Sequence, residues 1–175
     1  MAINGFGRIG RAVLRAWLER QVRVDDSAHQ LEFVAIGELH DMEAAIHLLS
    51  YDSTYGTLPV PVESRGDGFA VGGSLIRWFG SDHADQVPWG ELSVDLLMDC
   101  SGAYTDGARA ASHLDSGARR VLISAPATNV DKTVVYGVNH RELDGSERLI
   151  SNASCTTNGL ALIGQLLHRQ LGIEQ

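Results

Sequence analysis

Apolar runs typical of strands alternate with segments of helical period along most of this chain. The expected strands are residues 1–4, 31–36, 94–99, 120–124, 133–138 and 148–150. The expected helices are residues 8–20, 41–50, 105–116 and a last helix that begins near Cys155 and ends at Gly172. This alternation predicts right-handed crossovers, with helices on both faces of one sheet. The expected fold class is therefore α/β, with a doubly wound parallel sheet.

Residues 58–79 interrupt the alternation. Short apolar runs there are separated by Gly and Pro residues, which predict a small antiparallel hairpin insertion. The helical segments carry apolar stripes that predict their buried faces. These stripes are Ile9, Val13, Ala16 and Trp17 in the first helix, Met42, Ala45, Ile46 and Leu49 in the second, and Leu160, Ile163, Leu166 and Leu167 in the last.

The composition is that of a globular protein with no nucleic acid and no membrane as partner. Of the 175 residues, 44% are hydrophobic and 21% are charged, which excludes a disordered chain. The net charge is −8, from 14 basic and 22 acidic residues. Residues 1–4 carry no signal-like region, and no apolar run approaches the roughly 18 residues of a membrane span, so a cytoplasmic location is expected. Neither cysteine lies in a metal-binding pattern, so no metal is expected.

Three glycines, Gly5, Gly7 and Gly10, follow the first strand and open the first helix. In such a turn the first glycine permits a sharp reversal, the second lets the backbone approach a pyrophosphate, and the third lets the helix pack on the strand. The helix N-terminus also offers N–H groups and a partial positive charge to phosphates. The pattern alone is weak, because a strand–turn–helix unit can use glycines for its shape only.

Glu38, at the end of the second strand, strengthens the cofactor interpretation. Its carboxylate can accept hydrogen bonds from both ribose hydroxyls and would repel a 2′-phosphate, which favours NAD over NADP. Glu38 lies 28 residues after Gly10, more than the usual spacing of about 20. A polar loop at residues 21–30 accounts for the excess. The alternative is a solvated charge at the end of a strand.

Cys155 lies between a strand and the last helix, within residues 151–158, whose sequence is SNASCTTN. Unpaired N–H groups at a helix N-terminus stabilise a thiolate, and the polar neighbours can bind an oxyanion or a phosphate. This setting suits a nucleophile that attacks a carbonyl. The alternative is a buried structural cysteine, and we favour that role for Cys100, which lies inside an apolar strand.

Two segments resemble the glyceraldehyde-3-phosphate dehydrogenase family, which includes erythrose-4-phosphate dehydrogenase. They are residues 4–11 (NGFGRIGR) and residues 151–158. Residues 47–53, 88–89, 124–126 and 136–139 also resemble family segments, in the family's order. The resemblance implies NAD as cofactor and a Rossmann-type NAD-binding domain at residues 1–152. Residues 153–175 would begin the catalytic domain, of which the remainder would be missing.

The resemblance also implies a reaction, the phosphorylating oxidation of a phosphorylated aldehyde. Cys155 would attack the aldehyde, hydride would pass to NAD, and inorganic phosphate would release the resulting thioester as an acyl phosphate. Ser154 and Thr156 would bind phosphate. Family members are tetramers, so a homotetramer is expected of a full-length parent protein. The implied cofactor-binding residues are Gly5, Gly7, Arg8, Ile9, Gly10, Glu38, Ser101, Gly102 and Ser124.

The family's catalytic histidine, a general base that follows the helix after the cysteine, has no match in this sequence. The seven histidines are His29, His40, His47, His83, His113, His140 and His168. The chain is therefore expected to be a truncated form that is inactive by itself. The strand at residues 1–4 is short for a central position, which indicates a clipped start as well.

Three interpretations of function stay open. The first is a truncated dehydrogenase that acts on glyceraldehyde 3-phosphate, with erythrose 4-phosphate a close second because Glu38 replaces the family's more usual Asp. The second is a stand-alone, non-catalytic module that binds NAD or a protein partner. The third is a semialdehyde dehydrogenase, which fits Glu38 and the surroundings of Cys155 poorly.

Overall fold

The computed structural model describes residues 1–23, 31–81, 83 and 86–173. Its helices are α1 (Arg8–Arg23), α2 (Met42–Ser50), α3 (Gly107–Asp115) and α4 (Cys155–Leu171), with a 3₁₀ turn η2 (His140–Glu142). Its strands are β1 (Ala2–Asn4), β2 (Ala35–Gly37), β3 (Tyr51–Asp52), β4 (Gly56–Thr57), β5 (Val62–Arg65), β6 (Gly68–Val71), β7 (Ser74–Phe79), β8 (Leu96–Asp99), β9 (Arg120–Ile123), β10 (Lys132–Thr133) and β11 (Leu149–Ser151).

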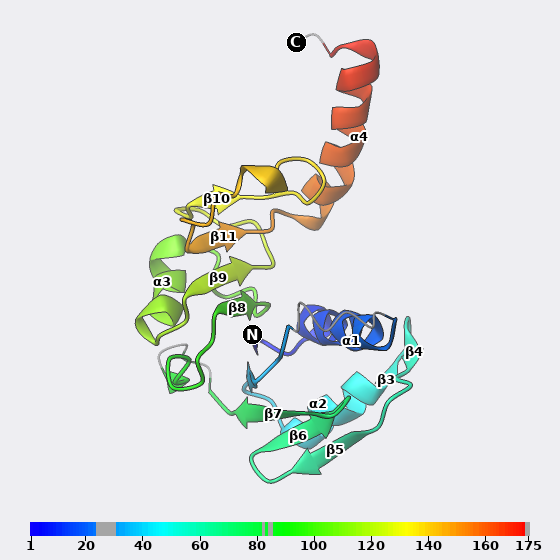
Figure 1. Ribbon diagram of the computed structural model, residues 1–175, viewed down its shortest axis with the longest axis vertical. Helices are drawn as coiled ribbons and strands as arrows, with labels where there is room; N and C mark the ends of the chain where they lie inside the picture. Colours follow the sequence, from blue (N-terminus) through cyan, green and yellow to red (C-terminus); the bar gives the residue numbers. More distant parts are fainter. Residues whose placement is uncertain (24–30, 82, 84–85, 174–175) are drawn as a thin grey trace.

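One nine-stranded sheet organises the molecule, in the order β10-β11-β9-β8-β1-β2-β7-β6-β5 (Figure 1). Strands β10 to β7 in this order pair in parallel, and only β6 and β5 at one edge are antiparallel. The doubly wound parallel sheet and its antiparallel hairpin are thereby confirmed. The hairpin joins the main sheet, because β7 pairs with β2. A second, small hairpin of β3 and β4 was not predicted.

Strand register shows that the helices cover both faces of the sheet. Ile3 pairs with Ile36, and both pack in a core cluster with residues of α1 and α2. Leu97 pairs with Val121, so both lie on the other face, where Val121 packs with Ala110 of α3. The side chains of adjacent residues in a strand point to opposite faces, so α1 and α2 cover one face and α3 covers the other.

The buried stripe of α1 differs from the prediction by a small rotation. Ile9 is 53% exposed and Ala16 is exposed, whereas Leu14, Trp17 and Leu18 are buried. Ile9 is rotated by about 100° from Gly10, which packs against Gly5 and Ile3, so Ile9 lies outside the buried face of the helix. The α2 stripe is confirmed, with Asp41 capping the helix by accepting a hydrogen bond from the Ala44 N–H at 2.9 Å.

Three further boundaries differ from the prediction. The helix α1 runs through residues 21–23 of the expected polar loop, and residues 24–30 lie outside the described part of the chain. The strand expected at residues 31–36 is regular only in β2. Residues 134–138 leave the sheet after β10, and Gly137 adopts a φ of +90°.

The last helix, α4, projects away from the sheet (Figure 1). Its predicted apolar face is solvent-exposed, and none of its residues is buried. Among the described residues, its hydrogen bonds to preceding segments run from Asn158 to the Asn152 carbonyl at 2.8 Å and from Gln165 to the Val138 carbonyl at 3.5 Å. The apolar period correctly predicted the position of the helix, but the face that it predicted to be buried is not covered by any described residues.

Candidate functional site

The carboxyl ends of five parallel strands form one straight row. Asn4 pairs with both Gly37 and Asp99, which end β2 and β8. Asp99 pairs in turn with Ile123, and Ile123 with Ser151, the last residues of β9 and β11. Every predicted site residue follows one of these ends within eight positions, so all of them gather at one edge of the sheet. The order of connection reverses at β1, and a crevice at such a switch point is where α/β sheets bind ligands.

The glycine turn combines close packing at two of its glycines with open space at the one between them. Gly5 adopts a φ of +85°, and a Cβ there would come within 2.5 Å of the Ser101 Cα. A Cβ on Gly10 would come within 2.3 Å of the Gly5 carbonyl oxygen, because α1 packs closely on the turn. At Gly7 a Cβ would meet no atom of the described residues within 4 Å. Gly5 and Gly10 are thus required by close packing, whereas Gly7 leaves the backbone open to a ligand.

The start of α1 supplies the electrostatic part of this site. The N–H groups of the first helical turn have no acceptor within the helix, and they carry the positive end of its dipole. Arg8 and Ile9 occupy this turn, and both are exposed. The arrangement fits the diphosphate of a dinucleotide.

Glu38 is tied directly to the glycine turn. Its carboxylate accepts a hydrogen bond from the Phe6 N–H at 2.7 Å, and its other oxygen faces the backbone and ring nitrogens of His40 at 3.1 and 2.6 Å. Burial of the side chain raises the pKa of Glu38, but the hydrogen bonds from His40 and Phe6 outweigh this effect and hold that pKa below its usual value. The side chain, 11% exposed, is therefore an ionised acceptor beside the turn.

Ser101, Gly102 and Ser124 follow β8 and β9. The Ser101 hydroxyl donates to Asp99 at 2.9 Å and accepts from the Ala103 N–H at 3.1 Å, which closes a tight turn. Gly102, at the tip of this turn, has a φ of +72° and open space where a Cβ would lie. The Ser124 N–H donates to the Asp99 carbonyl at 2.9 Å.

The two cysteines have different environments. Cys100, expected inside a strand, instead directly follows β8 and is partly buried. Burial raises the pKa of the Cys100 thiol to about 11, although a hydrogen bond with Ser124 lowers it. That thiol stays protonated and unreactive at neutral pH. Cys155 is exposed and is the first residue of α4.

A sharp turn presents Cys155 at the edge of the sheet. Ala153 lies between β11 and α4 with a φ of +57°, in the left-handed region that glycine normally occupies. The buried Ser151 hydroxyl holds this turn by donating to the Ala125 carbonyl at 2.8 Å and accepting from the Ala153 N–H at 3.1 Å. No signal in the sequence indicates this geometry, because the residue that adopts it is not a glycine.

Hydroxyl groups surround the start of α4. Ser154 caps the helix by accepting from the Thr157 N–H at 2.9 Å, and its oxygen lies 3.0 Å from the Thr156 hydroxyl. Thr156 is exposed and Ser154 is partly exposed. Together with the free N–H groups of the first turn, they form a neutral donor set that can receive an anion.

The histidines that the structure describes are engaged elsewhere or lie far from Cys155. His168, in the same helix, is 13 residues on, about 20 Å away at 1.5 Å per residue. His113 is fully buried against Asp99, and His140 accepts a hydrogen bond from the Gly137 N–H. Within the described part of the chain, no histidine takes the place of the general base.

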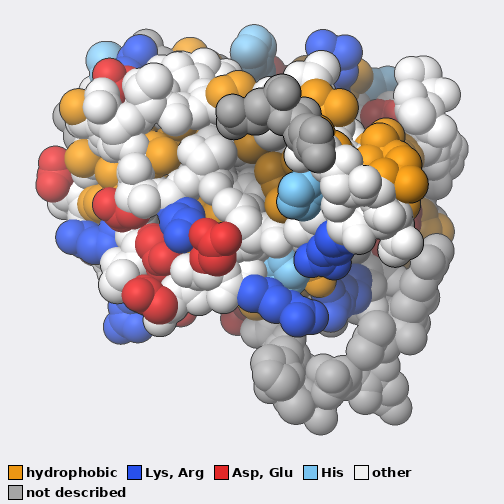
Figure 2. Space-filling model, turned by 90° about the horizontal axis from the view of Figure 1, so that it is seen from above, with side chains coloured by type: hydrophobic (Ala, Val, Ile, Leu, Met, Phe, Trp, Pro, Cys, Tyr) orange, Lys and Arg blue, Asp and Glu red, His pale blue; other side chains and the backbone are white. Residues whose placement is uncertain are grey.

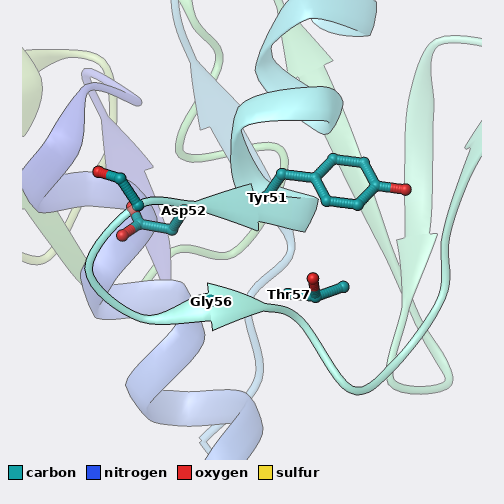
Figure 3. A pocket seen from close by; sticks show the side chains of 5 residues that line it. Tyr51, Asp52, Gly56 and Thr57 are labelled. Atoms are coloured by element: carbon teal, nitrogen blue, oxygen red, sulfur yellow. The ribbon is translucent and has the colours of Figure 1, made fainter.

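A shallow hollow of about 280 Å³ lies elsewhere, on the β3–β4 hairpin (Figure 3). It is lined by Tyr51, Asp52, Ser53, Gly56 and Thr57, and none of these is a predicted site residue.

The described residues include no group of three or more His, Cys, Asp or Glu placed to share a metal ion. None of the described helices is long and apolar enough to cross a membrane.

Charges of both signs are interspersed on the face seen in Figure 2, together with exposed hydrophobic side chains.

The sequence analysis missed the buried polar residues beneath the site, of which Asp99 is the centre. Their signal was a polar residue at the end of two neighbouring apolar strands, Asn4 in one and Asp99 in the other.

Comparison with known proteins agrees with this geometry. The family model for the NAD-binding domain of glyceraldehyde 3-phosphate dehydrogenase matches residues 1–107. Glyceraldehyde-3-phosphate dehydrogenase of Pseudomonas aeruginosa is 48% identical over 174 residues, which are 99% of this chain and 51% of that protein. The plasmid and chromosomal enzymes of Cupriavidus necator are each 47% identical, over 99% of this chain and 50% of theirs.

The chain thus spans about half the length of the curated relatives it matches. The predicted NAD-binding fold and the predicted resemblance are both confirmed by these matches. On the glycine turn, the row of strand ends and the family match together, the chain belongs to the glyceraldehyde-3-phosphate dehydrogenase family, with a Rossmann-type NAD-binding domain.

Proposed function

We propose that the complete protein containing this chain oxidises a phosphorylated aldehyde, with Cys155 as nucleophile and NAD as hydride acceptor. The observation that carries the proposal is the position of Cys155. It is exposed at the first residue of α4, at the same edge of the sheet as the glycine turn. β11 and β2 are four strand positions apart, about 19 Å at the usual spacing, so a dinucleotide held by Glu38 at one end extends toward Cys155 at the other.

In this proposal, one group of residues binds the cofactor and Cys155 reacts with the substrate. The glycine turn and the start of α1 would hold the pyrophosphate, Glu38 the adenosine ribose, and the turns with Ser101, Gly102 and Ser124 the cleft between. Bound NAD would supply the hydride acceptor. The Cys155 sulfur would attack the aldehyde carbon to give a hemithioacetal, and the Cys155 N–H would help to hold the oxyanion. Loss of hydride from this adduct to the hydride acceptor would leave a thioester on Cys155.

The second half of the reaction needs inorganic phosphate. Ser154 and Thr156 would hold a phosphate near the sulfur, and phosphate attack on the thioester would give an acyl phosphate and return the thiolate. We place the general base outside the described residues. Residues 1–152 would then form the NAD-binding domain, and residues 153–175 would begin the catalytic domain.

Glyceraldehyde 3-phosphate is the first candidate substrate, because the relatives are named glyceraldehyde-3-phosphate dehydrogenase. Erythrose 4-phosphate is the second, because Glu38 stands where an Asp is more usual. A tetramer in the cytoplasm completes the proposal for the complete protein.

A non-catalytic NAD-binding module is the alternative. One observation favours it: His113 contacts the buried Asp99 and His140 accepts from the Gly137 N–H, so neither is engaged with Cys155. The two functions differ in a single measurable property, the formation of NADH from an aldehyde.

The deciding experiment is Cys155→Ser in the complete protein, with Cys100→Ala as the matched control. Cys155→Ser is expected to lower the phosphate-dependent formation of NADH by at least about 10³-fold, because a serine hydroxyl is a far weaker nucleophile here. NAD affinity, measured by calorimetry, is expected to stay within about 2-fold of the parent value. Cys100→Ala should retain activity, because its thiol is partly buried and its raised pKa keeps it protonated.

Two results would count against this proposal. Activity that survives Cys155→Ser would show that another group is the nucleophile. A complete protein that binds NAD but forms no NADH with either aldehyde would establish the non-catalytic module instead.

A further inference from the structure

A buried polar cluster lies directly beneath the proposed cofactor cleft. Its centre is the Asp99 carboxylate, whose side chain is fully buried. One carboxylate oxygen accepts from the Asn4 amide at 2.8 Å and lies 3.2 Å from the His113 ring. The other accepts from the Ser101 hydroxyl at 2.9 Å and from the Ser101 N–H at 3.3 Å. These four residues are called the Asp99 cluster below.

The cluster joins four parts of the fold. Asn4 ends β1, Asp99 ends β8, His113 belongs to α3, and Ser101 lies in the turn that follows β8. A buried carboxylate is costly unless donors surround it, and here both oxygens are satisfied. Removal of the carboxylate would leave the Asn4 amide and the His113 ring without their acceptor in a place that water does not reach.

His113 fixes the helix side of the cluster. Its Nε2 faces the carboxylate, so Nε2 carries the proton and donates, while Nδ1 has no partner among the described residues. The ring packs against Tyr104, with 4.5 Å between centroids, and against Trp89 at 6.2 Å. Asp99 is therefore held from below by a side chain that cannot move into solvent.

Ser101 connects the cluster to the cofactor cleft. Its Cα is so close to Gly5 that a Cβ there would lie only 2.5 Å away. The Ser101 turn and the glycine turn are thus in close backbone contact at the switch point of the sheet, where α/β folds bind ligands. A shift of Ser101 by a fraction of an ångström would therefore displace the glycine turn.

We propose that Asp99 is a positioning residue for NAD: through Ser101 it sets the spacing between the two turns that receive the cofactor. Asp99 need not touch the cofactor, since its four contacts are all within the protein. The proposal rests on NAD binding by this domain and not on catalysis by Cys155. It is tested by NAD affinity alone, so a failure of the proposed reaction leaves it decidable.

The test is a double-mutant cycle in the complete protein, with the NAD dissociation constant measured by calorimetry where circular dichroism shows each variant folded. Asp99→Ala is expected to weaken NAD binding by about 10-fold, because the Ser101 turn is no longer held in position before NAD binds. Ser101→Ala should weaken it less. Because Asp99 acts through Ser101, the double variant should bind NAD no more weakly than Asp99→Ala alone.

Two controls separate positioning from general destabilisation. Asp99→Asn keeps the shape of the side chain and an acceptor for Ser101, so it should bind NAD within about 3-fold of the parent. Leu49→Ala removes a buried side chain of α2, on the other face of the sheet from α3, and should lower the unfolding temperature without changing NAD affinity.

The proposal is overturned by either of two results. One is an Asp99→Ala variant that binds NAD within about 2-fold of the parent or of Leu49→Ala. The other is a cycle in which the effects of Asp99→Ala and Ser101→Ala multiply, since independent effects would show that Asp99 does not act through Ser101. If Asp99→Ala does not fold, Asp99→Ser takes its place in the same cycle, with the same expected order and the same overturning results.

Discussion

At the scale of single residues, Glu38 illustrates how a backbone contact prepares a side chain for a ligand. The Phe6 N–H, in the middle of the glycine turn, donates to one carboxylate oxygen, and His40 faces the other. The hydrogen bonds hold the pKa of Glu38 below its usual value although burial opposes them. In the proposed site, this ionised carboxylate would accept hydrogen bonds from the ribose hydroxyls and repel a 2′-phosphate.

Glu38→Ala is therefore expected to reduce the preference for NAD over NADP. NAD binding should weaken by at least about 10-fold because two hydrogen bonds to a charged group are lost, while NADP binding should improve. The dissociation constants of both cofactors, measured by calorimetry, give the ratio. Glu63→Ala, which removes the same charge from the exposed edge strand β5, serves as the control. An unchanged ratio in Glu38→Ala would remove Glu38 from the cofactor site.

At the scale of elements, the three glycines of one turn have different reasons to be glycine. Gly10 is required by packing, because a Cβ there would come within 2.3 Å of a backbone oxygen. Gly7 has open space around its Cβ position and no positive φ, so the fold by itself does not require a glycine there. The sequence pattern treats the two alike, and only the structure separates folding from ligand approach.

Gly7→Ala should consequently affect NAD binding but not stability, whereas Gly10→Ala should affect stability. Gly7→Ala is expected to leave the free energy of unfolding unchanged within about 0.5 kcal/mol and to weaken NAD binding by at least about 10-fold, because its methyl group would occupy the approach of the pyrophosphate. Gly10→Ala is expected to cost about 2 kcal/mol or more, because α1 must move away from β1. Urea unfolding and calorimetry measure the two quantities. Full NAD affinity in Gly7→Ala would show that the pyrophosphate does not cross this residue.

The same distinction explains how much of the fold could be predicted. Strands and helices that follow one another along the chain were located by their apolar period, and the site glycines, Glu38 and Cys155 by local motifs. The face of α1, the exposure of α4 and the β3–β4 hairpin depend on what each element packs against. The apolar periodicity of a segment carries no information about that packing partner. The Asp99 cluster was missed for the same reason, since Asn4 and Asp99 are 95 residues apart and meet only through strand register.

At the scale of the whole molecule, the candidate cofactor-binding residues and Cys155 differ in how they are packed. The glycine turn, Glu38 and the Ser101 turn all rest on the packed sheet. The helix that carries Cys155 leaves that sheet, with Leu160, Ile163 and Leu166 each at least 59% exposed (Figure 1). An apolar helix face of this extent is unusual for a surface in contact with water alone.

The 175-residue chain by itself is therefore expected to bind NAD without oxidising an aldehyde. Binding needs only the carboxyl ends of the packed strands, whereas deprotonation of Cys155 needs a base, and His168 lies about 20 Å along α4. NAD binding should be detectable by calorimetry. NADH formation from glyceraldehyde 3-phosphate and phosphate should not exceed the rate of the same chain with Cys155→Ser. A chain that clearly exceeds this rate would show that the described residues, or those just outside them, contain a working base.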